Sequence, residues 1–358
     1  MRIAVIGMRG AGSSPDGIER ALTEICPRLT RRGHEIDVFS ERNGRSIADI
    51  SGTRVIRLPA MLPGMGEAAA HAMMASLVTA CRGYDVVNFC AGEPGGLFSL
   101  IAKLGLHRTV VSVHGLDHPS APPSLFGPES VAARFADEIT VVSRRIERHF
   151  RAAYGRETVY IPNGVSQSPA VPAATPLTAL GLPPRGYLLF ADRLVPESGC
   201  HLLIEAVNAI PQGHRLVVAE TGSGDDGYRT MLLGQADPTK VLFAGPAGGE
   251  VLDALMAHAH LVVLPSLAEE PPATLLQALA HGRAAVVSDE PGHLDVIGSD
   301  GFTFTSGDAG DLRRVLAWLV HDEEVVTRME VRAAATAATR YCWDHIAESY
   351  EQVFASVL

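Results

Sequence analysis

Short apolar segments alternate with helical patterns along almost all of the 358 residues, and this alternation is the strongest constraint on the fold. In the first half, the strand-like segments are residues 2–7, 35–40, 54–58, 86–89, 109–113, 138–142 and 158–161. In the second half, they are residues 187–191, 215–219, 240–244, 261–264, 284–288 and 302–304. Strands that alternate with helices form a parallel sheet with helices on both faces. We therefore predict an α/β protein with two doubly wound parallel-sheet domains.

A stretch rich in Pro, Ala and Ser, residues 166–186, separates the two series of strands. Such a composition is typical of a linker between domains. A chain of this length is also expected to form two domains of ordinary size. We therefore predict a first domain over residues 1–165, a second over residues 187–340 and a helical tail over residues 341–358.

The composition excludes several classes of function. The 47% hydrophobic and 20% charged residues are typical of a globular protein with a substantial core. A formal net charge of −10 without a basic block argues against binding to nucleic acid. The five cysteines lack the spacing of metal ligands and indicate free thiols in a reducing compartment. Because we find no signal peptide and no apolar run of about 18 residues, we expect a cytoplasmic protein without a transmembrane segment.

Residues 261–282 have the pattern of a buried strand, a short acidic loop and a helix. Glycine accepts a positive φ, so Gly282 suits the position after the last helical turn. Glu269 is then expected just before the helix N-terminus, and Gln277 one to two turns further on. The partial positive charge of a helix N-terminus makes it a site for a phosphate or another anion.

A loop rich in Gly and Ser, residues 8–17, follows the first strand at the edge of the sheet where α/β folds bind ligands. Its glycines allow the backbone to approach a phosphate or an acceptor closely. The loop also leaves open a dinucleotide-binding fold and hence a nicotinamide-dependent dehydrogenase. The spacing Gly7-x-x-Gly10-x-Gly12 differs from G-x-G-x-x-G, however, which disfavours that alternative.

The order Pro265-Ser266, Glu269, Gln277 and Gly282 resembles the signature of retaining family-4 glycosyltransferases of the GT-B fold, with Gln277 in place of the second Glu. Other segments match landmarks of that family in the same order, and the first of them resemble a subgroup that includes suspected rhamnosyltransferases. These segments are Gly7-Met8-Arg9-Gly10, Asp16-Gly17-Ile18-Glu19, Val113-His114-Gly115-Leu116-Asp117, Ile161-Pro162-Asn163-Gly164-Val165, Arg193-Leu194-Val195-Pro196-Glu197 and Tyr341-Cys342-Trp343-Asp344.

The resemblance implies two Rossmann-like domains that face each other across a cleft, with the C-terminal helix crossing back to the first domain. It implies transfer of a hexosyl or deoxyhexosyl group from a nucleotide diphosphate sugar to a hydroxyl of a glycan, natural-product or lipid-linked acceptor. The anomeric configuration would be retained, and neither a metal nor another cofactor would be required.

The resemblance also assigns roles to individual residues. The catalytic residues would be His114, Arg193 and Glu269. The donor-binding residues would be Gly17, Arg193, Ser198, Pro246, Glu269, Ala273, Thr274, Leu275 and Gln277. The residues on the acceptor side would be Gly10, Gly12, Glu19 and Asp117.

Two positions depart from the family pattern. Ser198 stands where the family has a Lys that shares the diphosphate with Arg193, and two cations stabilise a leaving diphosphate better than one. Gln277 accepts hydrogen bonds but carries no charge. These two residues motivate an alternative, a non-catalytic or altered GT-B homologue that binds a nucleotide or a glycan.

Overall fold

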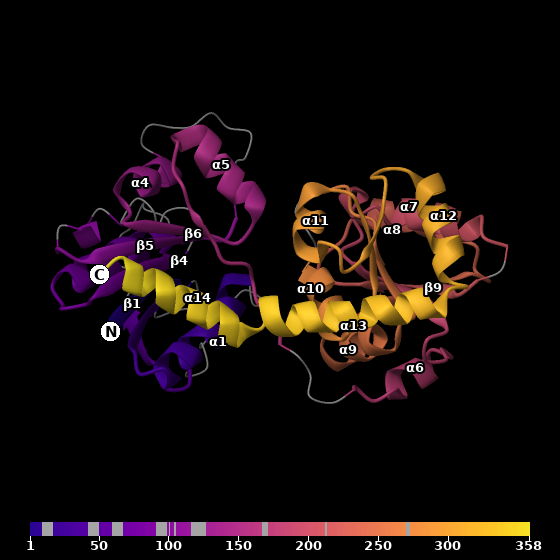
Figure 1. The fold of residues 1–358 in the computed structure, drawn as a ribbon, viewed down its shortest axis with the longest axis horizontal. Helices are drawn as coiled ribbons and strands as arrows, with labels where there is room; N and C mark the ends of the chain where they lie inside the picture. The colour runs from indigo at the N-terminus through magenta and orange to yellow at the C-terminus, as the bar shows by residue number, and fades with distance from the viewer. Residues whose placement is uncertain are drawn as a thin grey trace. The chain divides into compact units, whose positions relative to one another are not determined.

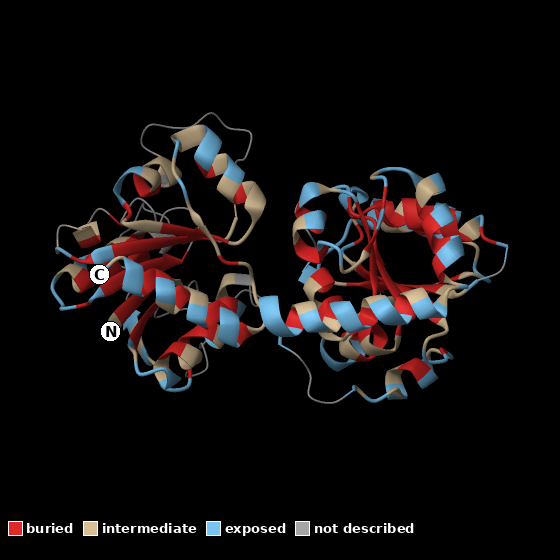
Figure 2. Ribbon diagram, in the orientation of Figure 1, coloured by how far each residue is buried: buried red, intermediate tan, exposed pale blue. Residues whose placement is uncertain are grey.

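The computed structural model of the protein describes residues 1–8, 17–41, 50–58, 67–90, 99, 101–103, 105–115, 127–166, 171–211, 213–269 and 273–358. The chain divides into two compact units, Met1–Gly164 together with Trp343–Leu358, and Val165–Cys342 (Figure 1). Each unit contains one sheet whose strands are largely buried, with helices that are buried on one side and exposed on the other (Figure 2). This confirms the predicted α/β fold with two doubly wound domains.

The sheet of the first unit has seven strands in the order β3-β2-β1-β4-β5-β6-β7, and its strand pairs are parallel. The strands are β1 (Arg2–Met8), β2 (Glu35–Glu41), β3 (Arg54–Leu58), β4 (Val86–Cys90), β5 (Arg108–Val113), β6 (Glu138–Val141) and β7 (Val159–Tyr160). The helices described in this unit are α1 (Gly17–Arg31), α2 (Glu67–Ala80), α4 (Pro128–Phe135), α5 (Arg144–Tyr154) and α14 (Trp343–Ser356). The strand order reverses between β1 and β4.

Strand β1 shows why the sheet is covered on both faces. Ile3 and Val5 pack with apolar side chains of α1 and α14, whereas Ala4 and Ile6 pack with those of α2, α4 and α5. Successive side chains of a strand point to opposite faces, so a continuous apolar run requires a core on each face.

Helix α14 belongs to the first unit although it ends the chain. Its Trp343 packs against Gly164, where a Cβ would lie 2.5 Å from the indole ring. Arg32 and His34 follow α1 and both contact Glu351 of α14: Nε of Arg32 donates to its carboxylate at 2.5 Å, and Nε2 of His34 lies 2.7 Å from it. The glycine of the Pro162-Asn163-Gly164 motif is thus required for close packing of this helix.

The sheet of the second unit has six strands in the order β10-β9-β8-β11-β12-β13, again with parallel pairs. The strands are β8 (Tyr187–Asp192), β9 (Arg215–Glu220), β10 (Val241–Pro246), β11 (Leu261–Leu264), β12 (Ala285–Ser288) and β13 (Phe302–Phe304). The helices are α6 (Thr175–Ala179), η1 (Pro196–Ser198), α7 (Cys200–Asn208), α8 (Asp226–Gln235), α9 (Gly249–His258), α10 (Ala273–Ala280), α11 (Pro291–Ile297), α12 (Ala309–Leu319) and α13 (Glu323–Arg340). The strand order reverses between β8 and β11.

The stretch expected to be a linker is largely part of the second unit. It contains α6, and Leu177 and Leu182 are 1% and 6% exposed in the core of that unit. The backbone N–H of Arg185 donates to the carbonyl of His258 at 2.7 Å. The high Pro and Ala content indicated a linker. The two buried leucines and the Arg185 hydrogen bond instead pack residues 177–185 against the second unit.

Candidate functional site

The point where the strand order reverses in the second unit brings together two of the predicted motifs. Arg193 and Ser198 follow β8, and Glu269 and Thr274 follow β11, its neighbour in the sheet. Parallel strands end at the same edge, and doubly wound sheets bind ligands outside these carboxyl ends. Two segments about seventy residues apart in the sequence therefore form one candidate site.

The loop after β8 is joined directly to the loop after β11. The carbonyl of Glu197 accepts hydrogen bonds from the Leu267 N–H at 2.8 Å and from the Ser266 hydroxyl at 3.3 Å. Gly199 has a φ of +69°, and a Cβ there would lie 2.0 Å from the Pro265 carbonyl oxygen. Only glycine allows this approach, so the turn that carries Ser198 is fixed against the strand end that precedes Glu269.

Arg193 presents a guanidinium at this edge. Its stem passes over Gly222, whose Cβ would lie 3.6 Å from Cγ of Arg193, and the residue is exposed. No carboxylate within the described ranges lies within 4.0 Å of its guanidinium. Burial raises the pKa of the adjacent Asp192, and the positive charge of Arg193 opposes that rise. Arg193 is therefore available to bind an anion.

Ser198 supplies no charge to the site. It is 3% exposed, and its hydroxyl donates to the Val195 carbonyl at 2.8 Å within the η1 turn. The Tyr228 hydroxyl lies beside it. A lysine at this position would have to extend its ammonium out of this buried turn to reach a ligand.

Helix α10 carries two buried polar atoms without partners. The Thr274 hydroxyl and the Gln277 side-chain oxygen are shielded from solvent, and neither forms a hydrogen bond with the part of the chain that the structure describes. The two residues are three apart and so share one helix face. Buried polar atoms without partners are rare and indicate a missing ligand or water.

Other predicted donor residues surround this helix. Ala273 is exposed, whereas the Leu275 side chain is fully buried in the core and leaves only its backbone for a ligand. Glu269 is half-buried, and residues 270–272 lie outside the described ranges. Gly282 has a φ of +63°, which confirms its predicted place after the helix.

Pro246 lies at the same edge of the sheet, at the end of β10 opposite Glu220 of β9. Sequence reasoning missed Glu220, a carboxylate that is 9% exposed and lies 2.6 Å from Arg229 in an ion pair. The available signal was an acid directly after the apolar run of residues 216–219.

The remaining predicted residues belong to the first unit. His114 directly follows β5 and is half-buried, and its Nδ1 has no hydrogen-bond partner among the described residues. Desolvation lowers the pKa of His114 to about 4, so its imidazole is neutral at neutral pH. Gly17 begins α1 and Glu19 lies in its first turn. Gly10, Gly12 and Asp117 lie outside the described residues.

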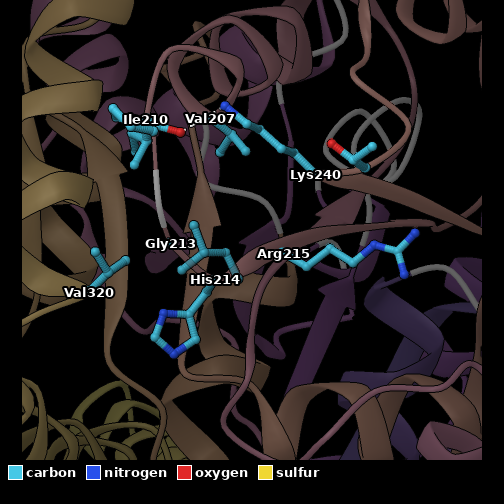
Figure 3. Close-up of a pocket in the computed structure, with 10 residues that line it drawn as sticks. Val207, Ile210, Gly213, His214, Arg215, Lys240 and Val320 are labelled. Carbon is cyan, nitrogen blue, oxygen red and sulfur yellow. Dashed lines mark hydrogen bonds between the residues drawn. The ribbon is translucent and has the colours of Figure 1, made fainter.

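A cavity of about 380 Å³ lies at the opposite edge of the second sheet, where β8 and β9 begin (Figure 3). It is lined by Leu188, Val207, Ile210, Pro211, Gly213, His214, Arg215, Thr239, Lys240 and Val320. The Lys240 ammonium donates to the carbonyls of Asn208 and Ile210, at 2.6 and 2.8 Å, and the Arg215 guanidinium points away from His214. The basic groups do not converge, and no predicted site residue lines the cavity.

None of the described helices has the length and hydrophobicity of a membrane span. Within the same ranges, no three His, Cys, Asp or Glu side chains are grouped as ligands of a metal ion.

Comparisons with known proteins agree with the fold. Residues 15–168 match the model of Glycosyltransferase Family 4, and residues 181–336 match that of Glycosyl transferases group 1. The D-inositol 3-phosphate glycosyltransferase of Xylanimonas cellulosilytica is 26% identical over 95% of this chain and 91% of its own length. The alpha-D-kanosaminyltransferase of Streptomyces kanamyceticus is 25% identical over 48% of this chain and 47% of its own.

Solved structures show the same fold over the whole chain. Anabaena HepE in complex with UDP and glucose has a TM-score of 0.76 at 20% identity and covers 99% of this chain and 100% of its own. Sucrose-phosphate synthase from Thermosynechococcus elongatus has a TM-score of 0.75 at 20% identity, with 99% of each chain covered. The family matches in both halves, together with two parallel-sheet α/β domains, identify this chain as a glycosyltransferase of the GT-B fold.

Proposed function

We propose that this glycosyltransferase moves a hexosyl or deoxyhexosyl group from a nucleotide diphosphate sugar to an acceptor hydroxyl, with retention of configuration and without a metal. The proposal is carried by the polar groups at the carboxyl edge of the second sheet. There, no carboxylate of the described chain lies within 4.0 Å of the Arg193 guanidinium, and the polar atoms of Thr274 and Gln277 lack hydrogen-bond partners within the same described ranges.

Each of these groups suits one part of a nucleotide diphosphate sugar. Negative charge develops on the diphosphate as it leaves, and Arg193 offers charge-assisted hydrogen bonds to it. The amides of residues 273–275 at the start of α10 add partial positive charge, so the site would not need a metal for this purpose. Gln277 would hold the ribose hydroxyls, and Glu269 would contact hydroxyls of the donor sugar.

The first domain would supply the acceptor side. A neutral His114 suits contact with the transferred sugar, because it donates or accepts a hydrogen bond without bringing a charge. Gly10, Gly12, Glu19 and Asp117 would line the acceptor. The relatives include a glycosyltransferase of D-inositol 3-phosphate and one that acts on a diphospho-undecaprenol-linked sugar, which supports a polyol or lipid-linked acceptor. A glycan or natural-product acceptor is the other part of the proposal. A deoxyhexose such as rhamnose is the sugar that the sequence resemblance favours, and we propose a cytoplasmic location.

A thermal-shift panel of UDP-, GDP- and dTDP-sugars in the presence of a chelator tests the proposal. We expect at least one of them to raise the melting temperature, since a ligand that binds only the folded state stabilises it. The same donor should then release its nucleotide diphosphate when an acceptor is added. Failure of every donor to stabilise the protein would contradict donor binding, and stabilisation that chelator abolishes would contradict the metal-free part.

A non-catalytic homologue that binds a nucleotide or a glycan is the second candidate. The buried Ser198 favours it, because it supplies no cation to a leaving diphosphate. The uncharged Gln277 favours it as well, because an amide oxygen accepts weaker hydrogen bonds from ribose hydroxyls than a carboxylate does. Stabilisation by a donor, with neither transfer nor donor hydrolysis over a range of polyol, glycan and lipid-linked acceptors, would establish this candidate.

A further inference from the structure

A buried chain of hydrogen bonds runs from α11 to the loop after β11. His293 of α11 and Ser288 at the end of β12 are both 0% exposed. The Ser288 hydroxyl lies 2.8 Å from Nδ1 of His293 and 2.6 Å from the Ser266 carbonyl oxygen. Three elements that end or begin at the carboxyl edge of the sheet are linked in this way.

The directions of these hydrogen bonds follow from the number of protons. The Ser288 hydroxyl has one proton and donates it to the Ser266 carbonyl, which has none. Ser288 therefore accepts from His293, and Nδ1 of His293 bears the ring proton. Nε2 is left as a buried acceptor, without a partner among the described residues. Burial lowers the pKa of His293 and keeps the ring neutral.

Ser266 connects this chain to both halves of the candidate site. Its hydroxyl accepts from the Ala268 N–H at 3.2 Å, directly before Glu269. The same hydroxyl donates to the Glu197 carbonyl at 3.3 Å, directly before Ser198. A shift of Ser266 would therefore move the loop of Glu269 and the turn of Ser198 relative to each other.

We propose that His293 is a positioning residue for donor binding, which acts through Ser288 and Ser266 on the loop that carries Glu269. The proposal rests on the proposed function, because the loop is taken to contact the donor. His293 is fully buried and does not touch the donor itself. Its loss should weaken donor binding by about tenfold, the usual effect of one lost buried hydrogen bond, and leave the acceptor KM unchanged.

Two amide substitutions separate this role from simple packing. In His293→Asn, the amide nitrogen takes the place of Nδ1 and still donates to Ser288. In His293→Gln, the amide lies near the place of Nε2, and the donor to Ser288 is lost. We expect the donor KM of His293→Asn to stay within about threefold of wild type and that of His293→Gln to rise about tenfold. Melting temperatures without ligand report any general loss of folding.

Ser288→Ala provides the second measurement. It removes the middle of the chain, so His293→Gln should raise the donor KM no further in that background. Additive effects, or equal donor KM values for the Asn and Gln variants of an active enzyme, would overturn the proposal. If the wild-type protein neither binds nor uses any nucleotide sugar, the proposed function itself fails, and this inference fails with it.

Discussion

In each sheet, a glycine packs closely against a backbone carbonyl at the point where the strand order reverses. In the first unit, Gly7 of β1 has a φ of +127°, and a Cβ there would lie 1.8 Å from the carbonyl oxygen of Cys90, which ends β4. In the second unit, Gly199 stands in the same relation to the Pro265 carbonyl, at 2.0 Å. In both, a glycine with positive φ, in β1 itself or in the turn after β8, allows the backbone to approach the end of the fourth strand closely.

The side chains around the two points differ. On the strands beside Gly7, Asn88, Ser112 and Thr140 bond to one another across β4, β5 and β6, at 2.9 Å for each contact. At the second point, the polar atoms of Thr274 and Gln277 have no partner in the described chain, and no carboxylate there lies within 4.0 Å of the Arg193 guanidinium. Satisfied polar groups stabilise a core, whereas buried unsatisfied groups are uncommon and mark a candidate contact for a ligand. Topology alone therefore does not distinguish a donor site.

The largest effect should come from breaking the shared arrangement. Gly7→Ala and Gly199→Ala each place a Cβ within 2.0 Å of a backbone carbonyl at positive φ. We expect each to lower the free energy of unfolding by at least ~3 kcal/mol, measured by urea denaturation. Gly181→Ala is the matched control: its φ is +63° with nothing within 4 Å, so a loss of only about 1–2 kcal/mol is expected. Equal losses in all three variants would show that the close approaches do not matter.

The second prediction tests Arg193, the cation at the second point. Arg193→Ala should cost about 3 kcal/mol of transition-state stabilisation, because no second cation shares the leaving diphosphate. The measurement is kcat/KM for the donor. Arg215→Ala, at the opposite edge of the same sheet, serves as the control and should leave donor kinetics unchanged. Full activity of Arg193→Ala would place the diphosphate elsewhere.

The third prediction adds the missing charge. Ser198→Lys should tighten binding of the nucleotide diphosphate by about tenfold and leave turnover equal or higher, because the new ammonium gains contact as the diphosphate leaves. Isothermal titration with the nucleotide diphosphate and with the uncharged nucleoside separates phosphate contacts from base contacts. Ser198→Ala controls for loss of the buried hydroxyl. Weaker diphosphate binding at unchanged stability would argue against this position.

The smallest effect concerns the first unit and its pH dependence. The pKa of His114 is lowered from 6.5 to about 4 by desolvation, so the unfolded chain binds its proton at a higher pH than the folded one. The contribution of neutral His114 to the free energy of unfolding should therefore be fully present above pH 6.5 and be lost as the pH drops toward 4. For this half-buried group, we expect a loss of about 1 kcal/mol between pH 7.5 and 5. His114→Gln should remove this share of the slope in urea denaturation. An unchanged slope would show that His114 is solvated.

Local patterns predicted the strands well, since burial on both faces leaves an uninterrupted apolar run such as residues 187–191. The composition of residues 166–186 predicted a linker, but composition does not reveal that Leu177 is buried in the core of the second unit. Motif spacing led to Arg193 and Glu269, which the fold places after two neighbouring strands at one edge of the second sheet. The hydrogen bonds that hold their loops in place were not predictable from the sequence. They depend on backbone carbonyls such as that of Glu197 and on tertiary contacts of His293.

The return of the last helix to the first unit has a consequence for synthesis. Trp343, Ile346 and Phe354 of α14 are core residues of the unit that also contains β1. During translation, the second unit is complete when Cys342 emerges, whereas the first still lacks one wall of its core. The domain that begins the chain is therefore the last to finish folding, and a ribosome stalled before residue 343 would leave its apolar face open to chaperones and to aggregation.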